Sequence, residues 1–202
     1  ETSRGLGDVY KRQILNSFRD IQIKLLNKFV LRSFFHAIGV SLWFYSMTVI
    51  TIAEVTAIGY LTPIFVCIGA IILFKENLKG FRAFAITLSF IGAMIILRPG
   101  FQEINLGQYS MLLAAFVFSF SYLMVKYLAK TKSSLEIVGF LSIFTTIFLT
   151  PLALIHWVEL NTDQISIIIL ISIIATIGHL TMTMAIKATT MTIICLLYTS
   201  DA

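Results

Sequence analysis

Long apolar stretches alternate with short polar segments along most of the chain. A helix needs about 20 apolar residues to cross a bilayer, and six stretches reach or approach that length. They are Ser33 to Ile52, Val55 to Phe74, Ala83 to Leu97, Tyr109 to Val125, Ile137 to His156 and Ile165 to Ile186. The pattern predicts an all-α, polytopic integral membrane protein with about six transmembrane helices in this chain.

The basic residues between these stretches fall on alternate sides of the predicted membrane. Lys and Arg near helix ends stay on the cytoplasmic side. One side carries only Arg98, whereas the other carries Arg19, Lys24, Lys28, Arg32, Lys75, Lys79, Arg82, Lys126, Lys130, Lys132 and Lys187. We therefore place the basic side, including residues 14–32, in the cytoplasm, and expect a multi-pass protein of the inner (plasma) membrane. The net charge of +5 is thus a signal of topology and gives no support to a nucleic-acid partner.

Composition and motifs narrow the function classes. Hydrophobic residues make up 58% of the chain and charged residues 12%, against about 25% charged residues in soluble proteins. The lipid bilayer is therefore the expected surrounding. The sequence has no metal-ligand spacing, no catalytic constellation and no glycine-rich phosphate loop, which predicts no enzyme activity, no metal and no cofactor. A gradient of a solute or ion, rather than ATP, would then drive any transport.

The residues at both ends of the chain have a pattern that indicates a non-native origin. The DNA string GATGTGTATAAGAGACAG can encode Asp8 to Gln13, and its reverse complement, read one base out of frame, encodes Cys195 to Ser200. This resembles the transposase adapter of a sequencing library, so we expect residues 1–13 and 195–202 to be adapter-like, non-native tails. The alternative is a genuine polar tail at each end. On the first interpretation, the native segment is an internal fragment of a longer protein.

The native segment contains a weak internal repeat. When the chain is shifted by 139 positions, Ile38-Gly39 aligns with Ile177-Gly178, and Thr51 aligns with Thr190. The first copy runs outward from the cytoplasm and the second runs inward, so the two copies are inverted. Inverted repeats build many secondary transporters, whose substrate sites lie near the membrane midplane where the repeats meet.

A series of short motifs resembles one family. The motifs are Phe44-Tyr45-Ser46-Met47, Ala53-Glu54-Val55-Thr56-Ala57-Ile58, Leu61-Thr62-Pro63-Ile64-Phe65, Phe74-Lys75-Glu76, Gly92 and Ile95-Ile96-Leu97-Arg98-Pro99-Gly100. In this order they resemble the drug/metabolite transporter superfamily of the EamA-domain type, which is built from two inverted five-helix repeats. The resemblance implies that the chain covers helices three to eight. Residues 33–100 would be the last three helices of the first repeat, and residues 101–194 the first three helices of the second.

Several polar or aromatic residues within the predicted spans are candidates for a substrate site or pathway. Pro63 has no N–H to bond the carbonyl of Gly59, so the second span should kink there, and Tyr60 and Thr62 supply hydroxyl groups nearby. His179 stands in the middle of the sixth span among threonines. Tyr and Trp combine a large apolar body with a hydrogen-bonding group, which suits a pocket for an amphipathic solute. The further candidates are Trp43, Tyr45, Ser119 and Tyr122.

Glu54 is a separate candidate. It is the acidic residue that lies close to a span and away from the cytoplasmic edge, where a carboxylate is a functional suspect. If transport is coupled to protons, Glu54 is the expected coupling carboxylate. The alternative is a solvated carboxylate at the turn between the first two spans.

These observations predict a secondary active or facilitative transporter of small organic metabolites that works by alternating access. The alternatives are an intramembrane enzyme or lipid-handling protein, and a membrane assembly subunit without transport. Coupling to a proton or counter-solute and assembly into a homodimer both stay open. The sequence does not select a substrate.

Overall fold

The computed structural model describes residues 23–76, 80–97 and 105–189 of the 202-residue chain. Every regular element within these ranges is an α-helix, which confirms the all-α prediction. The helices are α2 (Ile23–Val49), α3 (Ile52–Gly59), α4 (Leu61–Phe74), α5 (Gly80–Leu97), α6 (Leu106–Leu128), α7 (Ser134–Ile155) and α8 (Thr162–Ala188). Both predicted adapter-like tails lie outside the described residues.

The predicted spans fall on these helices, with the second span divided between α3 and α4, and apart from the start of α2 the ends differ by a few residues. Four helical segments in the described part of the chain are long and apolar enough to cross a membrane: Ile52–Phe74, Leu106–Leu128, Ser134–Ile155 and Thr162–Ala188. The protein is therefore an all-α, polytopic membrane protein. Helix α2 begins at Ile23 and not at Ser33. The last part of the segment that was expected to be cytoplasmic, residues 14–32, therefore belongs to this helix.

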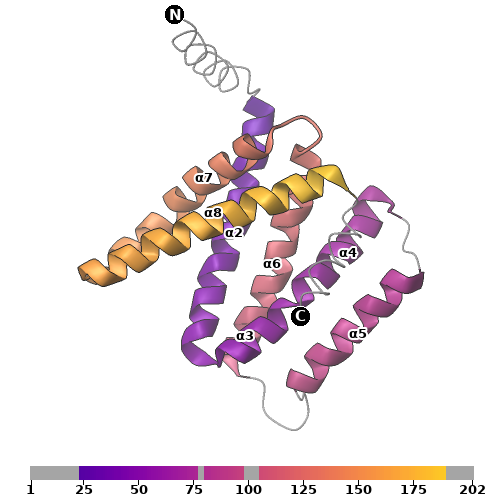
Figure 1. Cartoon of the computed structure of the whole chain (residues 1–202), viewed down its shortest axis with the longest axis horizontal. Helices are drawn as coiled ribbons and strands as arrows, with labels where there is room; N and C mark the ends of the chain where they lie inside the picture. The colour runs from indigo at the N-terminus through magenta and orange to yellow at the C-terminus, as the bar shows by residue number, and fades with distance from the viewer. Residues whose placement is uncertain (1–22, 77–79, 98–104, 190–202) are drawn as a thin grey trace, which may run out of the picture.

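Helices α2 and α6 lie side by side at the centre of the bundle (Figure 1). The α3–α4 segment packs on one side of α6, and α5 packs outside that segment. Helix α7 packs against α2, while α8 contacts α7 and the end of α6. Figure 1 shows α7 and α8 running together past α2, with the first part of α8 projecting beyond α2 at the left of the view. All of residues 151–178 are exposed.

Small residues let the central helices approach closely. Ala114 and Ala115 of α6 are completely buried, and they pack with Ile58 and Leu61 of the α3–α4 segment. On α2, a Cβ atom added at Gly39 would lie 2.7 Å from the ring of Phe118. Because apolar side chains gain little by leaving lipid, such close packing is what holds membrane helices together.

The second predicted span is interrupted where the sequence predicts a kink. Helix α3 ends at Gly59, and α4 begins at Leu61 after Tyr60. Pro63 therefore lies in the first turn of α4, where a missing N–H costs little. The Tyr60 N–H donates back to the carbonyl of Thr56, at 3.2 Å, and so closes the end of α3.

Five of the lysines that were expected on the cytoplasmic side, Lys28, Lys126, Lys130, Lys132 and Lys187, lie at one end of the bundle. This end comprises the start of α2 and α7 and the ends of α4, α6 and α8. The contacts that join these elements are Lys28 with the Tyr127 hydroxyl, Lys126 with the Ile186 carbonyl at 3.1 Å, Lys187 with the Lys132 carbonyl at 3.3 Å, and Lys130 over the Phe74 ring at 5.9 Å. The structure thus places these lysines together, as the alternation of charge requires.

Candidate functional site

Four polar side chains from three helices, two of them buried and two half-buried, lie close together, and we call them the buried polar cluster. They are Arg32 and His36 of α2, Tyr122 of α6 and His179 of α8. The ring centroids of His36 and His179 are 5.4 Å apart, and Tyr122 and both histidines lie within electrostatic range of the Arg32 guanidinium. Arg32 is 1% exposed and His36 is 7% exposed. Since they stand four positions apart, they share one face of α2.

Several buried polar atoms in and beside this cluster have no hydrogen-bond partner. They are Nε of Arg32, Nδ1 of His36, and the hydroxyl oxygens of Ser33 and Ser121, which adjoin Arg32 and Tyr122 in sequence. Leaving a buried polar group unpaired costs about 1–3 kcal/mol, and native proteins contain few such groups. Their concentration on α2 and α6 marks this region as more than a packing surface.

Arg32 is hydrogen-bonded to α7, but no acidic side chain among the described residues pairs with it. Its Nη1 donates a hydrogen bond of 2.8 Å to the carbonyl of Ile137, in the first turn of α7. The ion pair between Lys132 and Glu136, at 3.6 Å, does not involve Arg32. An uncompensated buried charge is expensive, by several kcal/mol per ion. The cluster therefore combines a fixed positive charge with unused hydrogen-bond donors in an apolar bundle.

Two of the sequence-predicted residues, Tyr122 and His179, lie in this cluster. The ring of Phe118 lies beside it, 5.2 Å from His36 and 6.4 Å from Tyr122 between centroids. Ser119 is buried on α6, and its hydroxyl donates to the Phe116 carbonyl of the same helix at 2.6 Å. That bond leaves the Ser119 hydroxyl occupied within α6.

The remaining predicted pathway residues lie elsewhere in the bundle. Trp43 is half-buried against the apolar core that α3, α4 and α6 share, and Pro63 is buried in α4. Tyr60 and Thr62 are half-buried at the interruption between α3 and α4. Tyr45 is 47% exposed on α2. The structure therefore does not bring these five residues together with His179, and their roles stay predictions.

Glu54 forms hydrogen bonds at the N-termini of two helices, α3 and α6. Its carboxylate accepts hydrogen bonds from the N–H and hydroxyl of Thr51, at 3.0 and 2.8 Å, and this caps α3. It also accepts a bond of 3.0 Å from Nε2 of Gln108, whose own carbonyl oxygen caps α6 by accepting from the Asn105 N–H. Glu54 thus links the first turns of α3 and α6, at the end of the bundle opposite to the lysines.

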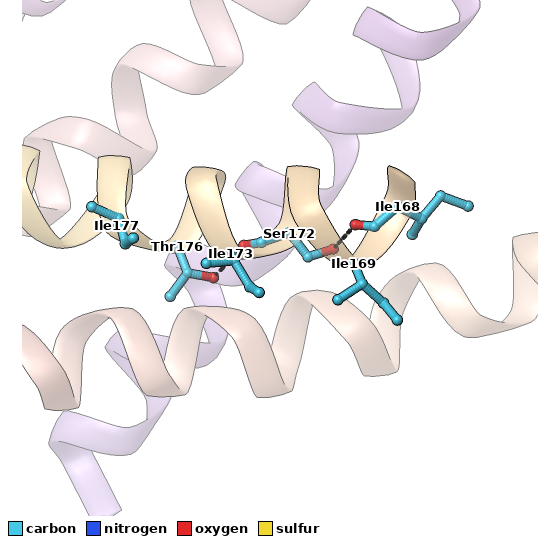
Figure 2. Close-up of a pocket in the computed structure, with 6 residues that line it drawn as sticks. All are labelled: Ile168, Ile169, Ser172, Ile173, Thr176 and Ile177. Carbon is cyan, nitrogen blue, oxygen red and sulfur yellow. Dashed lines mark hydrogen bonds between the residues drawn. The ribbon is translucent and has the colours of Figure 1, made fainter. Parts of the chain in front are cut away.

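An open hollow on the surface of α8 is mainly apolar, unlike the buried polar cluster (Figure 2). It has a volume of about 390 Å³ and is lined by Ile168, Ile169, Ser172, Ile173, Thr176 and Ile177. Its two hydroxyl groups are already bonded to carbonyls of the same helix, Ser172 to Ile168 and Thr176 to Ser172, both at 2.7 Å. The hollow therefore offers an apolar surface without free polar groups, and it suits lipid or another helix.

Sequence reasoning missed Arg32 and His36 as site residues. Arg32 was interpreted as one of the cytoplasmic topology charges, and nothing in its neighbours indicates that α7 covers it. The available signal was the spacing of Arg32, Ser33 and His36, which places three polar groups within one turn of α2. Among the described residues, no group of three or more His, Cys, Asp or Glu side chains could hold a metal ion.

Comparison with known proteins gives one family. The model of the EamA-like transporter family matches residues 10–98 and again residues 105–201. No solved structure matches the chain.

Two groups of curated relatives are similar to the chain. A riboflavin transporter of Vibrio cholerae is 32% identical over 142 residues, which is 70% of this chain and 48% of the relative. An S-adenosylmethionine uptake transporter of Rickettsia prowazekii is 24% identical over 139 residues, which is 69% of this chain and 47% of the relative. The chain thus spans about half the length of the curated relatives it matches.

Proposed function

Because the chain belongs to the EamA-like transporter family, we propose that the complete protein moves a small organic metabolite across the inner membrane by alternating access. The observation that carries this proposal is the double match of the family model, once on each half of the chain. Two matches support a pair of repeats whose boundary lies near residue 100, with residues 33–100 in the first and residues 101–194 in the second. The protein is a transporter and not an enzyme.

The buried polar cluster supports a place for the substrate. It joins α2 of the first repeat to α6 and α8 of the second, and transporters with inverted repeats bind substrate where the repeats meet. Polar groups inside a membrane bundle are costly and mark solute pathways. Tyr122 and His179 are then substrate-binding residues, and Arg32 and His36 join them.

The names of the relatives suggest the class of substrate. One group is named for uptake of S-adenosylmethionine and the other for riboflavin. Both solutes are medium-sized cofactors or cofactor precursors that combine a flat aromatic ring with a polar chain. We propose that this protein carries a metabolite of that size and amphipathic character.

Uptake by proteoliposomes tests the proposal. Vesicles that contain the complete protein should accumulate at least one radiolabelled metabolite from a panel including S-adenosylmethionine and riboflavin, faster than empty vesicles do. An excess of the unlabelled compound should abolish the signal. Failure across a broad panel of amphipathic metabolites, with the protein shown to be folded in the vesicles, would overturn the transport function.

The non-transport alternative makes the opposite prediction for two substitutions. A structural subunit should tolerate Tyr122→Leu and His179→Leu, whereas a transporter should lose most of its uptake. Tyr109→Leu and His156→Leu are matched controls, because they make the same changes at exposed positions. Normal uptake in the Tyr122 and His179 variants would favour the subunit.

A further inference from the structure

We propose that the buried polar cluster binds the anionic group, a carboxylate or phosphate, of the transported solute. The inference deepens the proposed function, since it takes the ligand to be the substrate. It rests on three observations: a buried guanidinium with no acidic partner among the described residues, unpaired polar groups in and next to the cluster, and aromatic rings that contact His36 and Tyr122.

The first observation concerns charge. Arg32 is almost completely buried, and no acidic side chain in the described part of the chain pairs with it. His36 and His179 lie within electrostatic range of this guanidinium and add imidazole groups instead of a carboxylate. A buried charge is retained where a partner compensates it. The missing partner is an anion, and the cluster can receive one from a ligand.

The second observation concerns hydrogen bonds. Nη1 of Arg32 donates a hydrogen bond to the Ile137 carbonyl, while Nε stays unpaired. The hydroxyls of Ser33 and Ser121 are also unpaired. Guanidinium N–H groups and hydroxyls can all donate, and the oxygens of a carboxylate or phosphate accept several bonds at once. An oxyanion would satisfy the open N–H of Arg32, and Ser33 on α2 and Ser121 on α6, next in sequence to Arg32 and Tyr122, offer further open hydroxyls.

The third observation concerns the neighbouring surface. The rings of Phe118 and Tyr122 are stacked at an interplanar angle of 25°, and the Phe118 ring also lies 5.2 Å from His36. An aromatic surface next to a few convergent polar groups is typical of sites for amphipathic small molecules. A solute with an apolar or aromatic body and one anionic group fits this combination.

Binding to matched pairs of probes tests the proposal. The complete protein, purified in a neutral detergent, is titrated calorimetrically with N-acetyltryptophan and N-acetyltryptophanamide, then with glutamate and glutamine, and finally with phenyl phosphate and phenol. In at least one pair the anionic member should bind at least about tenfold more tightly, which is the ratio expected from one charge-assisted hydrogen bond. Equal binding within every pair, or no binding at all, would overturn the proposal.

Substitution of Arg32 separates ligand binding from folding. Arg32→Gln should abolish the preference for the anionic probe and leave the ligand-free protein at least as thermally stable, because an uncompensated charge is removed. Lys130→Gln is the matched control: it removes the same charge at an exposed position and should keep the preference. If Arg32→Gln unfolds the protein, Ser121→Ala, which removes one unpaired donor, should still weaken binding of the anionic probe severalfold. An unchanged preference in a folded Arg32→Gln or Ser121→Ala variant would contradict the proposal.

A lipid phosphate could supply the same chemistry, so the titration includes dioctanoyl phosphatidylglycerol. Competition between this lipid and the soluble anion at one site is compatible with the proposal, whereas binding of the lipid alone would overturn it. The binding test does not depend on transport. Selective anion binding without uptake would refute the transport function only, and uptake of neutral metabolites without anion preference would refute this inference only.

Discussion

Gly39 shows how closely α2 and α6 must approach for the buried polar cluster to form. A Cβ atom at this position would lie 2.7 Å from the Phe118 ring, which itself contacts His36. We expect Gly39→Ala to destabilise the protein by about 1–3 kcal/mol, the usual effect of overpacking. Thermal unfolding in detergent measures the change. Adding Phe118→Leu should recover part of the loss, since the smaller side chain gives room.

Gly139 is the matched control for this prediction. It also lies inside a helix, but no atom comes within 4 Å of an added Cβ. Gly139→Ala should therefore be neutral or slightly stabilising, by up to about 1 kcal/mol, because Ala favours a helix. Equal destabilisation at both glycines would show that contact with Phe118 is not the cause.

Glu54 can be tested for capping and for proton coupling with two substitutions. Glu54→Gln keeps a side-chain oxygen for the Thr51 cap and removes the ionisable group, so stability should change little. Glu54→Ala removes the cap and should cost about 1 kcal/mol. If Glu54 couples transport to protons, uptake in Glu54→Gln should lose its dependence on a pH gradient at normal stability. A retained dependence would limit Glu54 to joining α3 and α6.

At the level of the helices, the interruption between α3 and α4 yields a prediction about Pro63. Pro63→Ala supplies the missing N–H opposite the Gly59 carbonyl, so α3 and α4 should join into a straighter helix. Ile52 and Leu73 are 73% and 62% exposed and can carry spin labels. The distance between the two labels, measured by double electron–electron resonance, should then increase. Uptake by the complete protein should fall, because the interrupted segment packs along α6.

Pro151 provides the control for that experiment. It lies inside α7, which stays continuous around it, and it is exposed. Pro151→Ala should leave uptake unchanged. An unchanged label distance in Pro63→Ala would mean that packing of α3 and α4 on α6, rather than the proline, holds the interruption.

The comparison of helices with the sequence shows what periodic and compositional signals can reveal. Runs of apolar residues predicted the helices, and the proline predicted the interruption, because both effects are local. The buried polar cluster required tertiary information. Arg32 resembles the neighbouring cytoplasmic lysines in sequence, and only the packing of α7 on α2 buries it. For the same reason His36 and His179, 143 positions apart, could not be paired before the fold was known.

At the level of the whole molecule, we expect that this chain needs further protein around it for transport. Residues 151–178 are exposed throughout, although they include the first part of the apolar helix α8, and the hollow in Figure 2 is open on the surface of that helix. The chain covers about half of its transporter relatives. The described helices that line the buried polar cluster are α2, α6 and α8, with α7 holding Arg32.

We therefore expect the 202-residue chain to insert into membranes but not to transport a solute. Alternating access requires two repeats that move against each other around an enclosed site, and this chain covers about half of its transporter relatives. Proteoliposomes with this chain alone should show no saturable uptake of a metabolite that the complete protein carries, at equal protein density. Non-specific leakage is excluded by showing that trapped calcein is retained. Saturable uptake by the chain alone, lost on Arg32→Gln, would mean that these helices already form a working transporter, for example as a homodimer.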